Sequence, residues 1–105
     1  MSEDLPIVCT LSETERASRR ERTVETLFKA AERVEELADG YAVRFPGEGD
    51  WPSRLLAFVA AERECCRFFR FELAFEPDLG PIWLRLRGPD GVKAFLRSWL
   101  EAVPS

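Results

Sequence analysis

The segment of residues 69–86, FRFELAFEPDLGPIWLRL, contains the pattern that decides the fold. Apolar residues occupy alternate positions on both sides of a Pro77-Asp-Leu-Gly-Pro81 stretch, first at Phe69, Phe71, Leu73 and Phe75 and then at Ile82, Leu84 and Leu86. Strict alternation is typical of a strand with one buried face, and proline and glycine between two such runs favour a turn. The segment therefore predicts a β-hairpin.

The flanking sequence predicts another strand and three helices. Residues 41–45 alternate in the same way and end at Pro46-Gly47. Helices are predicted over residues 12–38, 50–68 and 91–103, and in the first of these the apolar residues recur at helical spacing only from Val24 onward. The first of these helices begins with a capping box at Ser12 and Glu15, and Asp39-Gly40 is the expected stop signal. Residues 7–11 form a short apolar run that adds a candidate edge strand.

Together these elements predict one α+β domain over residues 1–105. We expect two layers, in which a small antiparallel or mixed sheet of three to four strands is covered by three helices in the order (β)αβαββα. A chain of 105 residues, 46% of them hydrophobic, is suited to a single core.

Charge and composition exclude several classes of function. A net charge of -4 argues against a nucleic-acid partner, and no apolar stretch approaches the ~20 residues that would cross a membrane, so we expect a cytoplasmic protein. The chain has no histidine, which rules out Cys-His dyads, Ser-His-Asp triads and HExxH zinc sites. An odd count of three cysteines in a reducing compartment favours free thiols or metal ligands over structural disulfides.

The predicted helix 50–68 contains the candidate site. At ~100° per residue, Glu62 falls in the middle of an apolar stripe that includes Leu55 and Phe58, and Cys65 and Cys66 follow one turn later. A carboxylate in an apolar face is costly unless it is protonated, hydrogen-bonded, paired or bound to a cation.

Cys9 would supply a third sulfur if the chain before the first helix returns beside the end of this one. Three thiolates and a carboxylate suit Hg(II), As(III), Cd(II), Cu(I) or Zn(II). The predicted metal ligands are therefore Cys9, Cys65, Cys66 and Glu62, with a soft metal ion or a small thiophilic ligand as the expected partner.

Two alternatives remain open, and no catalytic residue is assigned. Cysteines are often plain core residues, in which case Glu62 would pair with an arginine and the protein would be an interaction module or homodimer. Its contact surface would be the polar side of the sheet, with Arg44, Arg70, Glu72, Trp83, Arg85 and Arg87, or the residues Trp51, Trp83 and Trp99. Alternatively, a thiolate would act as a nucleophile with Glu62 as acid or base, in thiol redox chemistry or organometal cleavage.

The motif Glu62-Arg63-x-Cys65-Cys66-x-Phe68-Phe69-x-Phe71, followed by Pro81-Ile-Trp-Leu-x-Leu86 and Gly88-Pro89, resembles a family of small uncharacterised bacterial proteins that carry ERxCCxFxxF. The resemblance spans nearly the whole chain. It implies an association with heavy-metal resistance and assigns no activity or catalytic residue. Arg67 departs from the family pattern, which has proline at this position.

Overall fold

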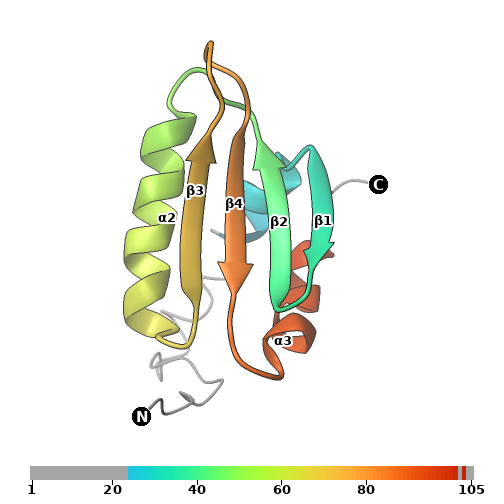
Figure 1. The fold of residues 1–105 in the computed structure, drawn as a ribbon. Coiled ribbons are helices and arrows are strands. Elements are labelled where there is room, and N and C mark those ends of the chain that lie inside the picture. Colours follow the sequence, from blue (N-terminus) through green and yellow to red (C-terminus); the bar gives the residue numbers. More distant parts are fainter. Residues whose placement is uncertain (1–23, 102, 104–105) are drawn as a thin grey trace.

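The computed structural model describes residues 24–101 and 103. Its elements, drawn in Figure 1, are a helical segment at residues 24–29, then β1 (Arg33–Leu37), β2 (Gly40–Phe45), α2 (Trp51–Cys65), β3 (Arg70–Phe75), β4 (Ile82–Arg87) and α3 (Val92–Leu100). The strands form one antiparallel sheet in the order β1-β2-β4-β3. The predicted α+β class, with its small sheet and three helices, is confirmed.

The first predicted helix is wrong over its last part. Residues 33–37, which we expected to be helical, form β1 and pair with β2. Asp39-Gly40 belongs to a hairpin turn and not to a helix end, because Leu37 is directly opposite Gly40 in the β1–β2 register. A Cβ at Gly40 would lie 1.8 Å from the backbone oxygen of Leu86, so the close approach of β2 and β4 requires glycine here. Residues 12–23 and the candidate strand 7–11 lie outside the described residues.

The predicted β3–β4 hairpin is confirmed, with Phe75 opposite Ile82 at its closed end. The backbone N–H of Gly80 donates to the carbonyl oxygen of Pro77 at 3.1 Å. Between them, Asp78 and Leu79 have φ values of 64° and 56°. Two positive φ values at the central positions are the signature of a type I′ turn, whose twist matches that of paired strands.

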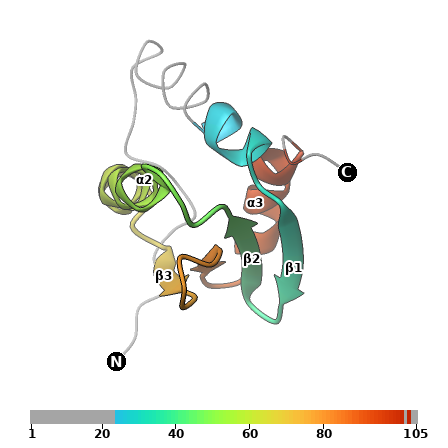
Figure 2. The same cartoon turned by 90° about the horizontal axis from the view of Figure 1, so that it is seen from above.

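The alternating apolar residues of the sheet face a core shared with the helices. Val43, Phe45, Ile82, Leu84 and Leu86 are buried on this side of the sheet. The helices contribute a further buried set, namely Phe28, Leu55, Phe58, Leu96 and Trp99. Figure 1 shows residues 24–29 and α3 behind the sheet, with α2 running alongside β3, and Figure 2 shows the same arrangement from above.

Aromatic contacts and one ion pair fix the helices in place. The ring of Phe28 lies 5.9 Å from that of Phe58 and 6.0 Å from that of Trp99, so residues 24–29, α2 and α3 meet at one point. Lys93 of α3 pairs with Glu36 of β1 and lies 5.6 Å from the ring of Tyr41. These contacts hold α3 against β1 and β2.

The opposite side of the sheet carries the polar alternate positions. The strand register places Arg44 beside Trp83, Arg85 beside Glu72, and Arg87 beside Arg70. No helix of the described residues covers this side, which we call the open face. Within residues 24–101, no helix combines the length and apolar character needed to span a membrane.

Candidate functional site

The predicted inward position of Glu62 on α2 is confirmed. Leu55, Phe58 and Glu62 are the buried residues of this helix, and each is separated from the next by three or four positions. Glu62 is 4% exposed, and it is the single buried charged side chain among the described residues. The helix thus places a carboxylate inside an otherwise apolar core.

The helix ends three residues earlier than the sequence predicted. Cys65 is its last residue, and Cys66 follows as the C-cap with φ -118° and ψ 79°. The backbone N–H of Cys66 donates to the carbonyl oxygen of Glu62 at 2.7 Å. The chain then turns, so that Phe68 and Phe69 are buried, and the ring of Phe69 packs against that of Trp99 with 5.5 Å between the ring centroids. Burial of these two rings favours the turn over a continued helix.

This turn brings Cys66 close to Glu62. The Sγ of Cys66 lies 3.6 Å from the Oε1 of Glu62, and Cys66 is fully buried. Cys66 is disulfide-bonded, contrary to the expectation of free thiols, so its sulfur carries no proton in this state. A hydrogen bond across the 3.6 Å contact then requires either a reduced thiol or a protonated carboxyl as the donor.

The other two predicted ligands are Cys65 and Cys9. Cys65 is a free, half-buried cysteine on the last residue of α2. Cys9, the remaining cysteine of the chain, lies outside the described residues. Over residues 24–101, no group of three or more candidate metal ligands is assembled, so the described part of the chain brings together two of the four predicted ligands, Glu62 and Cys66.

The surroundings of Glu62 and Cys66 determine which chemistry these two side chains can perform. Glu62 and Cys66 each take part in a further interaction, so the carboxylate is not left unpaired in the core. If the disulfide is reduced, Cys66 presents a thiol next to a carboxylate that can accept its proton. A thiolate formed there is buried and negatively charged, a state that a bound cation would stabilise.

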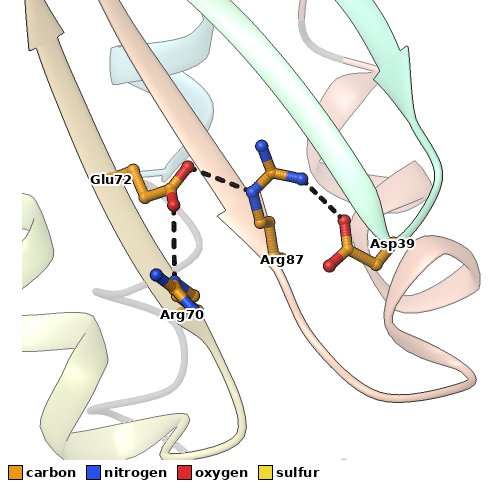
Figure 3. Close-up of polar contacts among 4 residues, drawn as sticks. All are labelled: Asp39, Arg70, Glu72 and Arg87. Atoms are coloured by element: carbon orange, nitrogen blue, oxygen red, sulfur yellow. Dashed lines mark hydrogen bonds and ion pairs between the residues drawn. The ribbon is translucent and has the colours of Figure 1, made fainter.

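A second polar arrangement lies on the open face, for which the sequence analysis predicted a contact surface as an alternative but no metal ligand or catalytic residue. Glu72 accepts from Arg87 Nε at 3.0 Å with one oxygen and lies 3.3 Å from Arg70 Nε with the other. Arg87 also donates to Asp39 in the β1–β2 turn at 2.9 Å. Figure 3 shows these four side chains as one continuous row across the sheet.

The ion pairs of this row shift the pKa values of their members. The hydrogen bond from Arg87 lowers the pKa of Glu72 below its ordinary value of 4.5, an effect that the nearby charges of Arg87, Arg70 and Arg85 reinforce and desolvation opposes. The hydrogen bonds to Glu72 and Asp39 raise the pKa of Arg87. In the sequence, charged residues at alternate positions indicated a polar side of the sheet. Which of them form ion pairs depends on the strand register, which the sequence did not give.

Comparison with known proteins assigns no function to either region. The resemblance to the ERxCCxFxxF family therefore stays a prediction, and function has to be argued from the geometry above. No protein-family model, no curated protein and no solved structure matches this chain.

Proposed function

We propose that the reduced protein binds one soft thiophilic metal or metalloid ion, such as Hg(II), As(III), Cu(I), Cd(II) or Zn(II). The ligands in this proposal are the thiolates of Cys65, Cys66 and Cys9, with the carboxylate of Glu62. The observation that carries it is the 3.6 Å separation between the Cys66 sulfur and an oxygen of the buried Glu62. The proposal names ligands and not a catalytic residue.

Ligand chemistry supports a soft ion. Thiolates select soft and borderline cations, whereas a site for Mg²⁺ or Ca²⁺ would need several oxygen ligands. Glu62 is the one buried carboxylate of the described residues, so it can give a single oxygen ligand or take up the proton that Cys66 releases. A bound cation would offset the cost of burying these negative charges.

The redox state of Cys66 sets a condition on binding. A disulfide sulfur is not a thiolate ligand, and Cys66 is disulfide-bonded in the structure. Two electrons and two protons from a dithiol reductant convert the disulfide to two thiols, and these can then lose protons to the ion, to Glu62 or to solvent. We therefore expect the reduced form to bind the ion and the oxidised form to bind it far more weakly.

Native mass spectrometry of the reduced protein tests the proposal. We expect one bound ion per chain when Hg(II), arsenite, Cu(I) or Zn(II) is added, and loss of that ion in Cys66→Ser and in Cys65→Ser. Glu62→Gln should weaken retention, while Glu101→Gln, which changes an exposed carboxylate, serves as the matched control and should bind like the wild type. Circular dichroism of each variant separates loss of binding from loss of fold.

Absence of stoichiometric uptake by the folded, reduced wild type would contradict the proposal. If one thiol then proves to be alkylated rapidly near neutral pH, the thiol–carboxylate enzyme becomes the better account. If all thiols react slowly, the cysteines are core residues.

A further inference from the structure

The open face carries a surplus positive charge at its centre. Arg70 and Arg87 share Glu72, and Arg87 also binds Asp39. Towards β1, Arg33 lies 3.3 Å from Glu35, and Arg44 lies 3.1 Å from Glu32 without hydrogen-bond alignment at Nε. Together with Arg85, the residues of this ion-pair network are five guanidinium groups and four carboxylates, so the network itself has one positive charge in excess.

Arg85 is the guanidinium in excess, as the register of β3 and β4 explains. It lies directly opposite Glu72, the carboxylate nearest to it across the β3–β4 pair. Both oxygens of Glu72 are already engaged, one by Arg87 and one by Arg70. Within residues 24–101, Arg85 has no ion pair of its own, although its charge helps to lower the pKa of Glu72. An unpaired guanidinium with bidentate geometry thus lies on a central strand of the open face.

A large aromatic side chain lies next to this cation. Trp83 is two residues before Arg85 on β4 and points to the same side, which puts the two about 7 Å apart along the strand. It is half-buried between Arg44 of β2 and Ala74 of β3. Tryptophan and arginine are the residue types most enriched among the hot spots of protein interfaces, and lysine, which is depleted there, is absent from the strand positions of this face.

From these observations we infer that the open face binds an acidic segment of a protein partner, with a carboxylate of the partner on Arg85 and an adjacent apolar side chain on Trp83. Charge complementarity selects this occupant. A second copy of the chain would bring its own Arg85 against this one. A nucleic acid carries a charge at every nucleotide and needs several unpaired cations, whereas among the described residues this network leaves only Arg85 unpaired, which suits a single carboxylate. This inference is independent of ion binding, because Cys66 and Glu62 lie in the core and not on the open face.

Fluorescence anisotropy with three labelled probes tests the inference. The probes are a short peptide of alternating glutamate and leucine, the same peptide with lysine for glutamate, and a deoxythymidine decamer. We expect the acidic peptide to bind most tightly and to bind more weakly as salt is raised. Arg85→Gln should raise its Kd about tenfold or more, since one charge-assisted contact is lost, and Trp83→Ala should weaken binding as well.

The matched control is Arg63→Gln, which removes an exposed guanidinium from α2 and should change the Kd by less than about twofold. An equal Kd in the wild type and in Arg85→Gln, or no binding of the acidic peptide, would overturn the inference. Tighter binding of the decamer would assign the face to nucleic acid instead. A dimer in sedimentation velocity that Arg85→Glu dissociates would assign it to a second copy. Cys66→Ser should retain peptide binding, which keeps this test separate from that of ion capture.

Discussion

At the scale of a single residue, the proposed function depends most on Glu62. A carboxylate that is 4% exposed loses most of its hydration, and besides its contact with Cys66 it takes part in a further interaction, so it is not left without a partner in the core. The same residue would serve as ligand or proton acceptor in the proposed ion site. Its role in stability can be measured separately from its role in binding.

Replacing Glu62 with alanine should lower the free energy of unfolding by about 1–3 kcal/mol, because its interaction in the core is lost and the shorter side chain leaves space in a buried position. Urea denaturation of the oxidised protein measures this change. Arg63→Ala, one position along the same helix and exposed, is the control and should change stability by less than about 0.5 kcal/mol. Equal stabilities for the two variants would mean that the Glu62 carboxylate contributes nothing to the fold.

The inward position of Glu62 could be predicted from the sequence, whereas the state of Cys66 could not. Helical periodicity fixes which side of α2 a residue occupies, so the spacing of Leu55, Phe58 and Glu62 was sufficient. Disulfide pairing depends on where distant segments lie, and an odd cysteine count pointed away from it. The early end of α2 at Cys65 was also missed, since it follows from burial of Phe68 and Phe69 after the helix.

At the scale of an element, the turn of the β3–β4 hairpin contains a residue with a strained backbone conformation. Leu79 is 74% exposed and has a φ of 56°, a conformation that costs a residue with a Cβ about 1 kcal/mol or more. Leu79→Gly should therefore raise the free energy of unfolding by about 1 kcal/mol, because glycine adopts positive φ freely and no buried contact is lost.

Thermal denaturation measures that gain, and Leu56→Gly provides the comparison. Leu56 is 55% exposed on α2, where glycine should destabilise by about 1 kcal/mol. If both substitutions destabilise, the left-handed turn at residues 78–79 is not the conformation that the protein adopts.

The row of ion pairs across the strands predicts a pH dependence. The pKa of Glu72 is lowered from 4.5 by Arg87, so the stabilisation from this pair is complete above about pH 4.5 and is lost as pH falls through the lowered pKa. Glu72→Gln should therefore lower the melting temperature at pH 7, and the gap to wild type should narrow by pH 3. Glu76→Gln, an exposed change beside the same hairpin, should show no such narrowing. A gap of constant size would contradict the assigned pairing.

β1 is the element that sequence reasoning missed, because its residues satisfy two patterns. Val34 fits the helical spacing that starts at Leu27 and Ala31, and it also fits strand alternation opposite Val43. Local periodicity cannot choose between these, whereas pairing with β2 does. The β3–β4 hairpin was predictable because both strands and the turn residues agree along one continuous stretch.

At the scale of the whole molecule, the two proposed functions belong to opposite sides of the sheet. Its core side faces the buried residues Glu62, on α2, and Cys66, directly after α2, and its open side presents Trp83 and Arg85. The proposed ion site and the proposed partner surface can therefore be altered independently. Arg85→Gln should leave ion uptake unchanged.

Ion binding should also stabilise the whole domain. A ligand that binds the folded state alone at a free concentration of 100 times its Kd adds about 2.7 kcal/mol to the free energy of unfolding. For a chain of 105 residues this corresponds to a rise of roughly 10–20 °C in the melting temperature of the reduced protein. Calorimetry with and without Zn(II) measures it, and Cys66→Ser should abolish the rise. A rise of the same size in that variant would place the ion elsewhere.

Titration of the reduced protein with Cd(II), followed through the ultraviolet thiolate-to-metal charge-transfer band, tests the central claim most directly. The account predicts a band that grows linearly to one ion per chain, is strongly reduced in Cys66→Ser and does not form with the oxidised protein. A featureless titration of the reduced wild type, or an undiminished band in Cys66→Ser, would contradict ion capture by the thiols beside Glu62.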